Sequence, residues 1–114
     1  MRDASVRLPG LPDGGQLMEA AYAAILQGAQ NIAREAGALC PRDTGELAAS
    51  IGVRADRQAG ALEVYASSPH AIFVELGTAS APAQPFMYPA YAMHRDALVR
   101  GVGQAVLEAI REGG

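Results

Sequence analysis

The stretch Ile51-Gly-Val-Arg-Ala-Asp-Arg-Gln-Ala-Gly-Ala-Leu-Glu-Val-Tyr-Ala66 decides the fold of this 114-residue chain. Apolar residues alternate with polar or small residues on both sides of Gln58-Ala59-Gly60. A period of two is typical of a strand with one buried face, and a glycine-containing triplet is typical of a turn. The stretch therefore predicts a β-hairpin whose matched apolar faces place Arg54 opposite Glu63. We expect this pair to set the register and to contribute only about 0.2–1 kcal/mol.

A long helix is predicted before the hairpin, over residues 16–38. Its apolar positions recur at alternating steps of four and three, which places them along one side of a helix. These positions are Met18, Tyr22, Ile25, Ala29, Ile32, Ala36 and Leu39. Asp13 is a candidate cap for the start, and Gly37 with Pro41 marks the end. Because the apolar stripe is short and contains alanine and tyrosine, packing on the sheet is favoured over a free coiled coil.

Asp43, Thr44 and Gly45 are predicted to form a structural turn between the helix and the hairpin. Asp43 or Thr44 can accept hydrogen bonds from the first N–H groups of a short helical turn, and Glu46 follows Asp43 at capping-box spacing. We expect this turn to direct Leu47 inward and to orient the next strand.

Three segments follow the hairpin. Residues 71–76 form a short apolar run that fits either a single helical turn or a strand. Residues 77–88 are expected to be a loop, and residues 89–112 a helix with Pro89 in its first turn. The apolar side of this last helix is expected to contain Ala92, Val99, Val102, Val106 and Ile110. Gly101 and Gly103 within it each reduce the stability of the helix by about 1 kcal/mol relative to alanine. Their presence is explained by close packing contacts, by a bend or by a tolerated weakness.

Residues 1–15 contain two prolines and three glycines without periodicity, so we expect a flexible N-terminal arm. Residues 16–114 are then a single α+β domain. Its expected architecture is a small, mainly antiparallel sheet with a long N-terminal helix and a C-terminal helix packed on one face.

Composition limits the classes of function. Half of the residues are apolar, 18% are charged and the net charge is −3, with nine arginines and no lysine. A broad basic surface for nucleic acid needs a cationic excess that this chain lacks. No stretch approaches the roughly 18 apolar residues of a membrane span, and no apolar signal region begins the chain. The single cysteine, Cys40, is expected to be a small buried side chain.

No constellation of residues predicts catalysis or a cofactor. His70 and His94 lie far apart in the sequence, without partners at metal-ligand spacing, so each is expected to pack at the surface or its boundary. A phosphate-binding glycine loop and a nucleophile elbow are also absent from the sequence. We therefore expect no enzyme activity, no metal site and no bound cofactor.

Three blocks of sequence carry a resemblance to a known family. The first contains Pro41, Thr44-Gly-Glu-Leu47 and Ser50-Ile51; the second is Ala71-Ile-Phe-Val-Glu-Leu-Gly-Thr78; the third is Pro85-Phe-Met-Tyr-Pro-Ala90. In this order the blocks resemble the tail-completion or head–tail joining proteins of long-tailed bacteriophages, in particular the gene-product-ten-like morphogenesis family of lambdoid siphophages. One position departs from the family pattern, because Pro69-His70 stands where a tyrosine usually precedes the alanine.

The resemblance implies a structural protein that forms a ring at the phage neck, completes or terminates the tail and joins it to the head connector. Its implied partners are further copies of itself, as a hexamer or a dodecamer, and the neighbouring connector or stopper and tail-tube proteins. The implied location is the virion, after synthesis in the bacterial cytoplasm. DNA would pass through the ring with only transient, non-specific contacts, for which Arg54 and Arg57 are the candidates.

The residues expected at subunit or partner interfaces come from the second and third blocks. They are Glu75, Gly77, Thr78, Pro85, Phe86, Met87 and Tyr88. Glu75 interrupts an apolar run, so it is expected to pair with an arginine, of this chain or of the next subunit, or to accept N–H groups of the Gly77-Thr78 turn. Phe86 is a candidate anchor for a partner or, alternatively, a residue of the chain's own core. The competing hypothesis for the whole chain is a small cytoplasmic binding module that acts on a host protein or nucleic acid.

Overall fold

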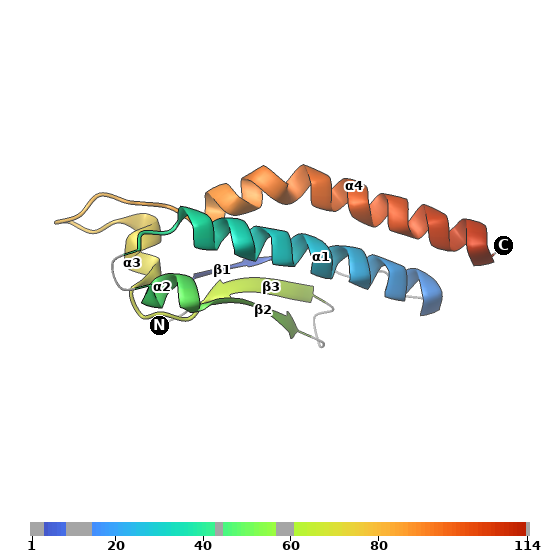
Figure 1. Ribbon diagram of the computed structural model, residues 1–114, viewed down its shortest axis with the longest axis horizontal. Coiled ribbons are helices and arrows are strands. Elements are labelled where there is room, and N and C mark those ends of the chain that lie inside the picture. Colours follow the sequence, from blue (N-terminus) through green and yellow to red (C-terminus); the bar gives the residue numbers. More distant parts are fainter. Residues whose placement is uncertain (1–3, 9–14, 43–44, 57–60, 114) are drawn as a thin grey trace.

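The computed structural model describes residues 4–8, 15–42, 45–56 and 61–113. Its elements, in chain order, are β1 (Ala4–Arg7), α1 (Gly15–Leu39), α2 (Glu46–Ala49), β2 (Ile51–Asp56), β3 (Ala61–Ala66), α3 (Ala71–Leu76) and α4 (Met87–Gly113). The described part of the chain is thus an α+β fold with two long helices and one antiparallel sheet, as predicted (Figure 1).

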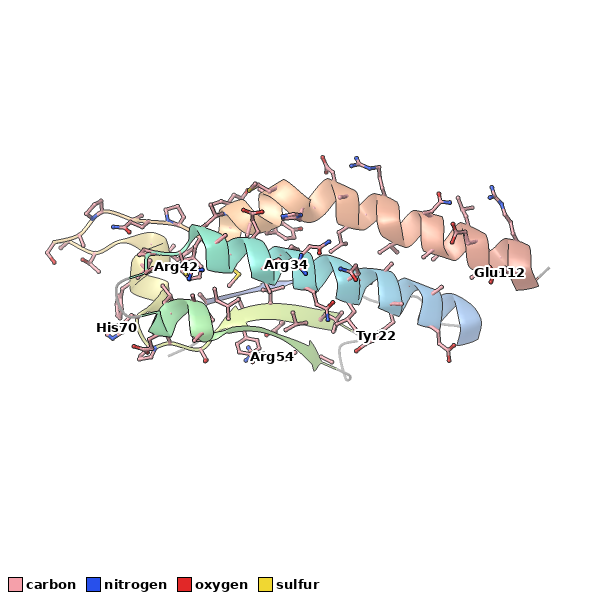
Figure 2. All side chains as sticks on the ribbon, viewed as in Figure 1. Tyr22, Arg34, Arg42, Arg54, His70 and Glu112 are labelled. Atoms are coloured by element: carbon pink, nitrogen blue, oxygen red, sulfur yellow. The ribbon has the colours of Figure 1, made fainter. Side chains whose placement is uncertain are left out.

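The hairpin forms in the predicted register. β2 pairs with β3, and Arg54 is the partner of Glu63. The Arg54 guanidinium donates to Glu63 Oε2 from Nε at 2.9 Å and lies 2.7 Å from it through Nη2. Because alternate side chains point to opposite faces, the pair lies on the side of the sheet away from α1 (Figure 2). The predicted turn at residues 58–60 lies outside the described residues.

Residues 4–8 are ordered, contrary to the expectation of a flexible arm over residues 1–15, whereas residues 1–3 and 9–14 lie outside the described part of the chain. Ala4–Arg7 form β1, which pairs antiparallel with β3 and makes the strand order β1-β3-β2. Leu8 donates its N–H to the carbonyl of Leu62 at 2.9 Å, and its side chain is buried in the core. The Pro- and Gly-rich composition of residues 1–15 concealed a strand of only four residues, which depends on β3 for its hydrogen bonds.

The helix α1 lies directly on the sheet and forms the middle layer of the molecule (Figure 1). The centre of the predicted stripe is buried, through Ile25, Ala29, Ile32 and Ala36. Tyr22 and Leu39, nearer the two ends of α1, are more exposed. The apolar faces of β2 and β3 complete the core, together with Phe86 and Met87 at the start of α4.

The helix α4 forms the third layer, because it packs mainly on α1 and reaches the sheet along β1 (Figure 1). Gly28 of α1 permits this approach: a Cβ atom at Gly28 would lie 2.5 Å from Leu98 Cδ1. The buried side of α4 therefore contains Leu98, and the apolar side predicted for this helix is wrong in part. Its members Ala92, Val99 and Ile110 are exposed, whereas Val102 and Val106 are half-buried.

Of the three alternatives given for the glycines within α4, close packing against another part of the described chain is excluded. A Cβ atom at Gly101 or Gly103 would meet no other atom within 4 Å. Neither glycine is needed for an intramolecular contact among the described residues.

Candidate assembly interface

The first sequence block forms a turn and the short helix α2. Gly45 has φ 78°, in the left-handed region that favours glycine, and α2 begins directly after it. Glu46 Oε1 accepts a hydrogen bond from Ser68 Oγ at 3.2 Å, which ties α2 to the chain just after β3. Leu47 packs against the core, as predicted. Asp43 and Thr44 lie outside the described residues, so their capping role stays a prediction.

The second block forms α3, which resolves the choice between helix and strand. Its residue Glu75 holds the beginning of α4. Glu75 Oε1 accepts the backbone N–H groups of Phe86 at 3.1 Å and Met87 at 2.9 Å, and Oε2 accepts the N–H of Tyr88 at 3.1 Å. The first N–H groups of a helix have no partner within the helix, and the helix dipole favours a negative charge there. Glu75 thus caps α4 from another helix.

This arrangement corrects the partners predicted for Glu75. Among the described residues no arginine pairs with it, and the N–H groups that it accepts come from the third block rather than from the Gly77-Thr78 turn. The sequence held one signal for this contact. No Ser, Thr, Asp or Asn stands directly before the helix that contains Pro89, so no local side-chain cap was available.

Residues 77–85 form a projecting loop that we call the finger (Figure 1). Thr78 and Ala81 form a two-hydrogen-bond bridge, with N–H to O distances of 2.8 and 3.4 Å. The Gln84 N–H donates to the carbonyl of Val74 at 2.8 Å, which fastens the returning limb to α3. All side chains from Thr78 to Pro85 are exposed, and none of them is charged. The finger is therefore a held, uncharged projection rather than part of the core.

Gly77 sets the direction of the finger. Its backbone has φ 80° and ψ 172°, a conformation that other residues rarely adopt. A Cβ atom at this position would lie 2.7 Å from the backbone nitrogen of Ala83. A glycine is thus required both by the backbone angles and by the close approach of the two limbs.

The predicted interface residues of the third block differ in their exposure to solvent. Phe86 and Met87 have exposed fractions of 0% and 2% and belong to the chain's own core, which for Phe86 is the second of the two alternatives given above. Tyr88, the next residue, is 68% exposed. Phe73 and Leu76 of α3 are also exposed, at 47% and 73%. Sequence reasoning missed these two residues because a short apolar run gives no indication of which side is buried.

A cleft of about 600 Å³ lies between α2, α3 and the finger. Its lining residues come from three segments: Pro41, Gly45, Glu46 and Leu47 in and before α2; Ser68, His70, Phe73 and Val74 in and before α3; Thr78, Ala81, Pro82 and Gln84 in the finger. Its walls are largely apolar. Figure 2 places His70 at this end of the molecule, beside α2. The three sequence blocks thus meet at one end of a molecule that is 58 Å long.

The other singled-out residues lie away from this end or form structural contacts. The Arg54 guanidinium lies 4.7 Å from the ring centroid of Tyr65, a cation–π distance, and Arg57 lies outside the described residues. His94 Nε2 lies 3.1 Å from Glu35 Oε1 and so connects α4 with α1. Cys40 is buried, and its thiol donates to the carbonyl of Gly37 at 3.4 Å.

Neither a metal site nor a membrane-spanning helix occurs within the described ranges. No group of three or more His, Cys, Asp or Glu side chains there is arranged to hold a metal ion. No helix in the same ranges is long and apolar enough to cross a membrane.

Comparison with known protein families gives a match. Residues 11–77 match the family described as "Bacteriophage HK97-gp10, putative tail-component". The match includes α1, the hairpin and α3, and it ends at Gly77, where the finger begins. The chain belongs to this HK97-gp10-like family. As a bacteriophage tail component it is a structural, virion-associated protein. Comparison with curated proteins gave no match. Comparison with solved structures gave none either.

Proposed function

We propose that this protein forms a ring at the head–tail junction, where it completes or terminates the tail and joins it to the head connector. The observation that supports the proposal is the gathering of all three sequence blocks at one end of the molecule. That end exposes Phe73, Leu76 and Tyr88 and carries the finger. Large apolar side chains gathered on a surface are typical of protein interfaces.

A ring requires two different complementary surfaces on each copy. Repetition of such a contact around an axis closes when the rotation does, as in cyclic oligomers. The held finger and the exposed residues of α3 are suitable for one such contact because their backbone is already ordered, so little entropy is lost on binding. The number of copies we propose is six, with twelve as the alternative.

The partners in this proposal are the connector or stopper proteins on the head side and the tail-tube proteins on the tail side. Passing DNA makes only transient contacts, because the net charge of −3 does not favour tight phosphate binding. Arg54 is the described candidate for these contacts, although its pairing with Glu63 reduces its availability.

Removal of the gene from the phage that carries it tests the proposal. We expect filled heads and separate tails in electron micrographs of the lysate, and restoration of joined particles by the purified protein. The purified protein should form rings, alone or on isolated tails, as measured by light scattering and microscopy. Normal virions from the deletion strain would refute the proposal. Tight binding of a monomer to a host protein would instead favour the binding-module hypothesis.

A further inference from the structure

The finger has one side that lines the chain's own cleft and another that is free. Thr78, Ala81 and Pro82 face the cleft. Ala79 and Ser80 at the tip do not line it, and both are exposed. Three restraints hold the finger in place: the Thr78–Ala81 bridge, the hydrogen bond from Gln84 to Val74 and the backbone angles of Gly77. The finger is therefore held firmly in place although it has no role in the core, so its function must lie outside the core.

The chemistry of the finger matches that of the cleft. The finger contains only Gly, Thr, Ala, Ser, Pro and Gln, so its backbone can come close to a partner and it presents no charge. The rest of the cleft lining includes Pro41, Leu47 and Phe73, and Phe73 is 47% exposed. A volume of about 600 Å³ lies within the usual range of binding clefts. Glu46 and His70 are the titratable residues of the lining, and Glu46 Oε1 accepts a hydrogen bond from Ser68 Oγ.

We infer that the tip of the finger inserts into the cleft of a second copy of this chain. The inference rests on the proposed function, since it names the surfaces through which the copies of the ring meet. Each copy donates one finger and accepts another, so the contact joins two different surfaces and can repeat.

The position of the two surfaces brings the same end of each copy together. The finger contributes part of the cleft lining and lies at one end of a molecule with extents of 58 × 25 × 21 Å (Figure 1). If they lay at opposite ends, repetition of the contact would stack the copies end to end as a filament. Because they share one end, each contact joins the same end of two neighbouring copies, and the rotation between the copies decides whether repetition closes a ring.

Disulfide trapping tests this contact with two single variants. Ser80→Cys places a thiol at the finger tip, and His70→Cys places one in the cleft, where the native side chain is exposed. The one native thiol, Cys40, is buried. When the two purified variants are mixed and oxidised, the disulfide can form only between chains. We expect a cross-linked heterodimer as the main product, and a ladder of oligomers from the double variant.

The controls are each variant alone and a matched pair in which Gln30→Cys replaces His70→Cys. Gln30 is exposed on α1 and does not line the cleft. Each of these controls should give only the background level of cross-linking that the native protein shows. A heterodimer yield no higher than that of the Gln30→Cys control overturns the inference, as does efficient cross-linking of Ser80→Cys with itself, which would indicate finger-to-finger contact.

The outcome is separable from that of the proposed function. Rings without the finger-to-cleft cross-link would refute only the inference. Efficient cross-linking together with normal virions from the deletion strain would refute only the role at the head–tail junction.

Discussion

The carboxylate of Glu75 in α3 accepts the backbone N–H of Met87 at 2.9 Å, at the first residue of α4. The same carboxylate also accepts the N–H groups of Phe86 and Tyr88. One side chain thereby joins the second and third sequence blocks. It fixes both ends of the finger, since the finger begins two residues after Glu75 and ends one residue before Phe86.

Glu75→Ala should therefore destabilise the fold. Loss of the cap leaves three N–H groups without their charged acceptor, and we expect the free energy of unfolding to fall by about 2–3 kcal/mol. Glu75→Gln retains an acceptor without the charge and should lose about 1 kcal/mol. Urea denaturation measures both values. Asp96→Asn on the exposed side of α4 is the control, and equal effects of all three substitutions would contradict the capping role.

Gly77→Ala should destabilise the finger through backbone strain. The left-handed φ and the 2.7 Å approach to Ala83 both oppose a Cβ atom, with an expected loss of about 1–3 kcal/mol. Gly101→Ala is the matched control, because that glycine lies in a helix with open space around it. There the substitution should stabilise the protein by about 0.5–1 kcal/mol. The midpoint temperatures of thermal unfolding of the two variants should therefore shift in opposite directions from that of the native protein.

Gly28→Ala should disturb the contact between α1 and α4. The new methyl group would overlap the side chain of Leu98, which is 5% exposed, and we expect a loss of about 1–3 kcal/mol. Leu98→Ala alone should lose about 2–5 kcal/mol because it creates a cavity. The double variant should lose less than the sum, since the added methyl occupies part of the space released. Strict additivity in denaturant titrations would mean that the two residues do not share one contact.

The variants Phe86→Ala and Tyr88→Ala should distinguish a residue of the core from a residue of the proposed interface. Phe86 is fully buried, so its truncation should lower the free energy of unfolding by about 3–5 kcal/mol. Tyr88 is 68% exposed, so its truncation should change stability by less than about 0.5 kcal/mol while it weakens assembly. Denaturation and light scattering measure the two effects. A Tyr88→Ala protein that assembles as well as the native chain would remove this residue from the proposed interface.

Arg54→Glu tests the proposed contact with DNA. The substitution places a carboxylate opposite Glu63 on a partly exposed sheet face, so the loss of stability should stay near about 1 kcal/mol. We expect rings to remain intact and DNA retention in assembled particles to change, because an added negative charge repels phosphate. Nuclease sensitivity of the packaged DNA measures retention. Unchanged retention would count against the contact.

Local patterns in the sequence were sufficient to predict the hairpin, its register at Arg54 and Glu63, and the long helix α1. Each of these depends on a repeat along the chain, with a period of two for strands and of about 3.6 for helices. The exposed state of Val99 and Ile110 was not predictable in this way. Their spacing fits a helix, but which side of α4 is buried depends on Gly28, which lies in another element.

The amino-acid sequence by itself determined the class of fold, the register of the hairpin and the membership of a phage tail family, because these depend on neighbours in the chain and on ordered blocks. Only the tertiary structure decided that residues 4–7 form a strand, that Phe86 is buried beside the exposed Tyr88, and that Glu75 caps a helix eleven to thirteen residues ahead. These features arise between segments that are distant in sequence, where a hydrogen-bond acceptor or an apolar surface becomes available only after the chain has folded.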